Sequence, residues 1–109
     1  MSRRIQVSTE DRIQTSSKSV EDVIVFCRKQ NGVVHIQIEN TTAISTTTTH
    51  SAVIPEVFRP TSQKRLVLDS DATNVIKVAI NSSGDYIVTI VGTATLAANE
   101  KVCFTYLME

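Results

Sequence analysis

The sequence predicts an all-β domain, a sandwich or barrel of about seven strands, and two observations carry this prediction. The first is composition: 109 residues contain 14 Val, 14 Thr and 11 Ile but only 4 Leu. Branching at Cβ restricts χ1 and favours a pleated strand over a helix. The second is spacing, because short apolar runs alternate with turn signals at intervals of roughly 8–12 residues. The length suits a single domain.

The N-terminal segment, residues 1–21, is polar and rich in Ser. We interpret it as a neck or linker that leads into a folded domain at residues 22–109. It has charge but no apolar core of the kind found in signal peptides, so secretion through such a signal is not expected. No run in the chain approaches the ~20 apolar residues of a spanning helix, so membrane insertion is not expected either.

The clearest element is a hairpin. Residues 23–29 (VIVFCRK) and 33–39 (VVHIQIE) flank Asn31-Gly32, a favoured turn because both positions tolerate positive φ. In the second strand, alternation assigns side chains to two faces, with Val34, Ile36 and Ile38 on one and His35, Gln37 and Glu39 on the other.

Residues 40–53 are rich in Thr and lack helix formers, which favours an extended strand or edge. The following segment, IPEVFRP (residues 54–60), has a proline near each end. A residue before proline is biased to extended geometry. We therefore expect a connection that the apolar pair Val57 and Phe58 pins to the core.

Further strands are expected at residues 65–68, 74–80, 85–91 and 101–107. The stretch 81–84 (NSSG) between two of them is typical of a turn. Alternation along residues 74–80 predicts that Lys77 points away from the core.

Charge and motifs exclude several classes of function. Eleven basic and eleven acidic residues cancel, with a pI near 6.7, so broad attraction to nucleic acid is not expected. There is no glycine-rich phosphate-binding motif. The outer face of the predicted hairpin, with His35, could approach a metal, yet an ordinary polar face explains it equally well. We expect no cofactor and no metal site.

An enzyme is not expected, since the only imidazole bases, His35 and His50, lie in no recognisable catalytic motif. A polysaccharide-degrading enzyme would need a pair of carboxylates, for which the chain offers Glu56, Asp69, Asp71 and Asp85. The two cysteines, Cys27 and Cys103, lie in strand-like runs without metal-ligand spacing. We expect buried free thiols; a disulfide between them depends on geometry that the sequence does not provide.

The order of these segments resembles a known family. The hairpin FCRKQNGVVHIQI is followed by the Thr-rich stretch, by IPE-x-FRP (residues 54–60) and by IKVAINSSGDYIV (residues 76–88). This arrangement is similar to the C-terminal head domain of receptor-binding proteins from siphophages that infect lactococci and related Gram-positive bacteria. The resemblance covers roughly residues 22–107, and IPE-x-FRP is its most specific part.

The resemblance implies a jelly-roll-like or Greek-key β-barrel that forms a homotrimer at the tip of the virion's tail baseplate. Such heads attach the phage, without catalysis, to host cell-wall or surface polysaccharide through clefts near subunit boundaries. The neck would join other baseplate proteins. The alternative is a purely structural trimeric tail or baseplate module without a ligand site.

Saccharide recognition needs hydrogen-bonding groups beside an apolar face. In the family, outward positions before the NSSG-like turn carry a polar sugar-binding set, and an aromatic residue follows the turn. The corresponding positions here are Lys77, Ala79 and Tyr86, and with no Trp the family's set is incomplete. The candidate saccharide-binding residues are His50, Arg65, Asp69, Asp71, Lys77 and Tyr86.

Overall fold

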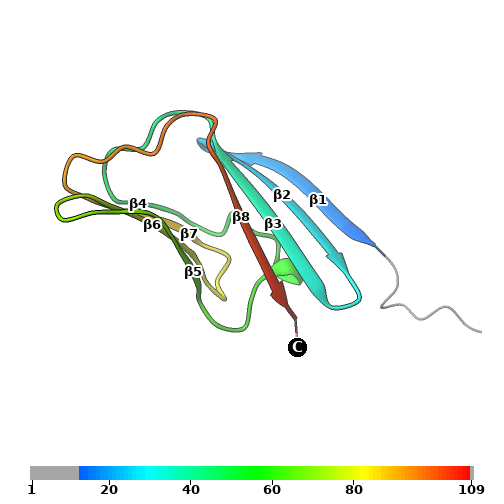
Figure 1. The fold of residues 1–109 in the computed structure, drawn as a ribbon. Helices are drawn as coiled ribbons and strands as arrows, with labels where there is room; N and C mark the ends of the chain where they lie inside the picture. The colour runs from blue at the N-terminus through cyan, green and yellow to red at the C-terminus, as the bar shows by residue number, and fades with distance from the viewer. Residues whose placement is uncertain (1–12, 109) are drawn as a thin grey trace, which may run out of the picture.

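The computed structural model describes residues 13–108, which form eight strands in two four-stranded antiparallel sheets (Figure 1). The strands are β1 (Gln14–Val20), β2 (Val23–Gln30), β3 (Val33–Asn40), β4 (Thr48–His50), β5 (Lys64–Ser70), β6 (Val75–Ile80), β7 (Tyr86–Val91) and β8 (Lys101–Leu107), with one 3₁₀ turn, η2 (Glu56–Phe58). The all-β prediction is confirmed. The predicted closed barrel is wrong, because the two sheets remain separate layers and each has two edge strands. No helix in these residues is long and apolar enough to cross a membrane.

The first sheet has the order β1-β2-β3-β8. Its centre is the predicted β2–β3 hairpin, which is confirmed, with Gln30 paired to Val33 across the turn. Asn31 and Gly32 have φ values of 55° and 78°, so both turn positions use the left-handed region. Asn and Gly adopt that region more readily than other residues, which is why the chain reverses here.

Residues 14–20 fall within the segment that the sequence interpretation assigned to the neck, and here they form β1. The strand pairs with β2 over its whole length, from Gln14 opposite Lys29 to Val20 opposite Val23. Its side chains on the inner side of the sheet are mostly polar, and Val20 packs against the core. Backbone hydrogen bonds therefore hold a strand that apolar periodicity does not reveal. Residues 1–12 of the neck lie outside the described residues.

The second sheet has the order β4-β7-β6-β5. Strands β5, β6 and β7 follow one another as neighbours, and β4 lies beside β7, which is the strand order of a Greek key. The long connection from β4 to β5 includes η2. Of the Thr-rich stretch at residues 40–53, only Thr48–His50 forms a strand in this sheet. A β-bulge between Val67 and Asp69 shifts the register of β5.

The core lies between the two sheets and is mainly aliphatic. Alternate residues of β2, β3 and β8 meet those of β6 and β7. The largest fully buried side chains are Val23, Val25, Val34, Ile36, Ile38, Val53, Ile54, Val78, Ile80, Tyr86, Val88 and Val102. The connections before β4 and after β7 run side by side and are joined by paired backbone hydrogen bonds between Ile44 and Leu96 (Figure 1).

The two cysteines differ in environment, so the prediction that both are buried is right for one of them. Cys27 faces the core, where burial raises the pKa of its thiol to about 12. Cys103 is exposed on β8, and both thiols are free. Cys27 pairs with Ile36 and Cys103 with Gln37, adjacent residues of β3 that point to opposite faces. The two sulfur atoms therefore lie on opposite sides of the sheet, and no disulfide joins them.

The segment IPEVFRP packs on the turn between β6 and β7. Phe58 is buried, whereas Val57 is 50% exposed, so only one member of the predicted apolar pair anchors the connection. The amide of Ile54 donates to the carbonyl oxygen of Gly84 at 3.0 Å, and Arg59 Nε donates to the carbonyl oxygen of Ile54 at 2.8 Å. The two sequence segments that carry the family resemblance are thus in direct contact.

Candidate functional site

Two of the candidate residues, Arg65 and Lys77, come together on the outer face of the second sheet. Arg65 pairs with Ala79 and Val67 pairs with Lys77 across β5 and β6, and the predicted outward orientation of Lys77 is confirmed by its exposure. Both charged side chains line one hollow of about 200 Å³. The complete lining is Gln63, Arg65, Lys77, Val78, Ala79, Ile87 and Thr89.

The hollow, here called the Arg65–Lys77 hollow, follows from side-chain size. Ala79 is the cross-strand partner of both Arg65 and Ile87. Its single methyl group leaves a depression between longer neighbours. Ala79 and Ile87 provide an apolar floor, and the guanidinium and ammonium groups provide hydrogen-bond donors at the rim. Polar groups around an apolar surface are the composition that a sugar ring needs.

His50 and Tyr86, which were also predicted to bind saccharide, do not lie on this surface. They are cross-strand partners on the inner face of β4 and β7, with exposures of 4% and 0%. Their rings stack with centroids 5.8 Å apart and an interplanar angle of 27°. The register of the second sheet therefore directs both rings into the core, where an external ligand does not reach them.

We predict that Tyr86→Phe leaves stability unchanged or raises it by up to about 1 kcal/mol, because the buried Tyr86 hydroxyl has no hydrogen-bond partner among the described residues. The matched variant Tyr106→Phe is expected to cost about 1–2 kcal/mol, because the Tyr106 hydroxyl donates to the carbonyl oxygen of Phe58. Urea unfolding of both variants measures the difference. Equal losses of stability would show that the Tyr86 hydroxyl is satisfied in solution.

The two candidate aspartates lie apart from the Arg65–Lys77 hollow. The Asp71 carboxylate accepts hydrogen bonds from the backbone amides of Thr73 and Asn74, each at 2.8 Å. These bonds lower the pKa of Asp71 and engage it in the turn between β5 and β6. Asp69 lines a different pocket, of about 310 Å³, together with Leu68, Ile76, Thr95, Leu96, Glu100 and Lys101.

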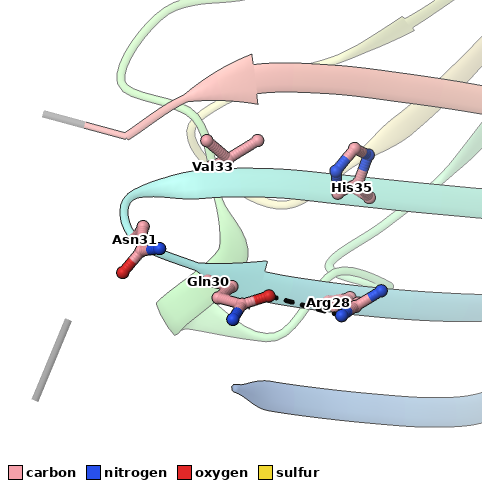
Figure 2. A pocket seen from close by; sticks show the side chains of 5 residues that line it. All are labelled: Arg28, Gln30, Asn31, Val33 and His35. Atoms are coloured by element: carbon pink, nitrogen blue, oxygen red, sulfur yellow. Dashed lines mark hydrogen bonds between the residues drawn. The ribbon is translucent and has the colours of Figure 1, made fainter. Parts of the chain in front are cut away.

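A third pocket, here called the hairpin pocket, lies at the β2–β3 turn and was not predicted. Its volume is about 270 Å³, and Arg28, Gln30, Asn31, Val33 and His35 line it (Figure 2). Arg28 and Gln30 come from β2, Val33 and His35 from β3, and Asn31 from the turn. The predicted hairpin already implies this pocket, because its register places Arg28 opposite His35. It was missed because side chains were assigned to faces only in the second strand.

Hydrogen bonds orient the polar groups of the hairpin pocket. Arg28 Nη2 donates to Gln30 Oε1 at 3.3 Å (Figure 2). His35 Nδ1 lies 3.0 Å from Thr105 Oγ1 on the neighbouring strand β8. The imidazole therefore has its other ring nitrogen, Nε2, to offer to a ligand as a donor or an acceptor.

Within the described part of the chain, no three His, Cys, Asp or Glu residues are grouped so that they could hold a metal ion. Comparison of the sequence with known protein families and with curated proteins found no match. A function for this chain therefore depends on its fold, its surface chemistry and the resemblance of its short sequence segments.

Proposed function

We propose that this chain is the head of a phage receptor-binding protein, which attaches the virion at its tail baseplate to a saccharide of the host cell surface without catalysis. The observation that carries the proposal is the Arg65–Lys77 hollow. Two residues selected from sequence for saccharide recognition line one depression on an exposed sheet face. The all-β fold and the contact between the two family-like segments support the same proposal.

The chemistry of the hollow suits a sugar that carries several hydroxyl groups. Arg65 and Lys77 donate hydrogen bonds to hydroxyl and ring oxygens, and the Thr89 hydroxyl both donates and accepts. The apolar floor contacts the C–H face of the ring. A ligand of this size buries little area, so the affinity of one site is weak. Many heads on one virion raise the effective concentration and provide firm attachment.

A homotrimer with a jelly-roll-like subunit is part of the proposal. Apolar side chains remain exposed on the second sheet, including Val67 at 62% and Val91 at 48%. A small aliphatic domain leaves much surface unburied, and a subunit interface covers such residues. The proposal includes other baseplate proteins as partners of the N-terminal neck.

The test measures binding of the labelled protein to a panel of cell walls from lactococci and related bacteria. The variant Arg65→Gln/Lys77→Gln is expected to bind at least about tenfold more weakly, because it removes both charged donors. The control Lys18→Gln/Lys101→Gln removes two positive charges outside the hollow and is expected to bind like the wild type. Equal weakening in both double variants would contradict the proposal.

The second candidate is a structural tail module. The exposed Val67 and Val91 favour it, since Val67 is the cross-strand partner of Lys77 and Val91 lies on the same face of the sheet. If that face is a subunit interface, the hollow is covered in the assembly. Light scattering at micromolar concentration distinguishes the cases together with the binding assay. A mass about three times 12.0 kDa with no binding to any cell wall favours the module; a clean monomer contradicts the trimer in both.

A further inference from the structure

We propose that the hairpin pocket is a second binding site, specific for a sugar that carries a carboxylate, such as a uronic acid. The pocket lies on the first sheet, whereas the Arg65–Lys77 hollow lies on the second, so the two sites stand on separate observations. The juxtaposition that carries the inference is the guanidinium of Arg28, the imidazole of His35 and the carboxamide of Gln30 around one pocket (Figure 2).

Charge favours an anionic group in the pocket. Among the described residues that line it, Arg28 carries the positive charge and no carboxylate opposes it. On the sheet face, Arg28 has Thr15 and His35 as its cross-strand neighbours, and neither is acidic. An arginine without a carboxylate partner offers its planar fork of donors to an incoming oxyanion.

Geometry favours a carboxylate over a phosphate. The fork of Arg28 matches the two coplanar oxygens of a carboxylate, and one cationic side chain balances one negative charge. His35 lies directly opposite Arg28, and its ring is oriented by Thr105. A doubly charged phosphate is better matched by several cations, and the remaining lining residues supply none.

The rest of the lining suits a sugar ring. Gln30 presents a carboxamide, which both donates and accepts hydrogen bonds and thus fits hydroxyl groups. Val33, the cross-strand partner of Gln30, is partly exposed and provides an apolar surface. The turn fixes these groups relative to one another, because Asn31 and Gly32 close the hairpin.

The test is a titration of the ¹⁵N-labelled full chain, followed by the NMR signals of residues 30–33 and of Arg28 Nε. Glucuronate is expected to give saturable shifts there with a Kd of about 1–10 mM. Acetate, glucose and inorganic phosphate are expected to bind at least about fivefold more weakly, because each lacks the ring, the charge or the planar carboxylate.

Two variants make the test specific. Arg28→Gln is expected to weaken glucuronate binding at least tenfold, and Arg28→Lys, which keeps the charge but loses the planar fork, about threefold. Lys18→Gln removes an exposed positive charge outside both the hairpin pocket and the Arg65–Lys77 hollow, so it is the control and is expected to bind glucuronate unchanged. The inference is overturned if no shifts occur up to about 50 mM, if Arg28→Gln binds as the wild type does, or if acetate or phosphate equals glucuronate. Cell-wall binding by the Arg65–Lys77 hollow is scored separately, so failure of one proposal does not imply failure of the other.

Discussion

Replacing Gly84 with Ala is expected to lower the free energy of unfolding by about 3 kcal/mol. Gly84 closes the turn between β6 and β7 with a φ of 82°, a region that alanine enters at a cost of about 1–2 kcal/mol. Steric crowding adds to this conformational cost. A Cβ at this position would lie 2.7 Å from the carbonyl oxygen of Ile54 and would collide with the Nε atom of Arg59.

The added methyl group cannot be accommodated by moving one flexible side chain, since the Ile54 oxygen belongs to the backbone. Displacing that backbone disturbs the hydrogen bond from the Ile54 amide to Gly84 and the one from Arg59 to Ile54. We therefore expect Gly84→Ala to weaken the connection between IPEVFRP and the second sheet. Urea unfolding measures the loss, with the m-value expected to stay constant.

Gly32→Ala is the control for this prediction. Gly32 has a similar φ of 78°, but a Cβ there would find its nearest neighbour, the Met108 carbonyl oxygen, at 3.5 Å. That is an ordinary contact, so Gly32→Ala is expected to cost only the conformational term, about 1–2 kcal/mol. Equal losses for the two variants would contradict the argument that close packing at Gly84 joins the two segments.

Alkaline conditions are expected to destabilise the fold by about 2 kcal/mol between pH 9 and pH 11 through the ionisation of Cys27 alone. Burial raises the pKa of Cys27 from 9.0 to about 12, so the folded state keeps this thiol protonated where the unfolded chain has released the proton. The stabilising contribution is therefore complete below pH 9 and is lost as the pH rises toward 12. Burial raises the pKa values of Tyr86 and Tyr106 as well, with the same sign, and charge on Cys27 raises that of Tyr106 further.

Cys27→Val tests the assignment, because valine is close in size to cysteine and does not ionise. Its stability is expected to fall less steeply than that of the wild type between pH 9 and pH 10, where the thiol of the unfolded chain ionises ahead of its tyrosines. The control Cys103→Ser removes the exposed thiol and is expected to keep the wild-type slope. An unchanged slope for Cys27→Val would show that other groups dominate the alkaline transition.

The sequence predicted strands well where one face is buried. The β2–β3 hairpin, the outward Lys77 and the strands of the second sheet follow from apolar alternation, because a one-residue slip would expose the core side chains. It missed β1, whose inner-side residues Ser16 and Lys18 are polar. Apolar periodicity carries no information about a strand that is held mainly through its backbone.

The candidate site was harder to predict than the fold. Arg65 and Lys77 lie on neighbouring strands, but no local pattern states that Ala79 would leave a hollow between them. His50 follows four threonines and reads as a surface residue, yet its pairing with Tyr86 turns it into the core. That pairing joins strands separated by more than thirty residues, a relation that local reasoning does not contain. The hairpin pocket was not predicted because its lining comes from both strands of the hairpin, whereas side chains were assigned to faces only for residues 33–39.

Lys18 on β1 has a consequence for how molecules of this protein avoid one another. The unpaired backbone groups of an exposed sheet edge can pair with a strand of another molecule, and repeated pairing of this kind leads to aggregation. Lys18 lies on the inner side of β1, opposite Val25, where a strand added by another molecule would have to pack beside its ammonium group. The second sheet has other protection: β4 has three residues, and the bulge in β5 interrupts its register. The polar inner side of β1, which hides the strand from apolar periodicity, thus also hinders another molecule from adding a strand at this edge.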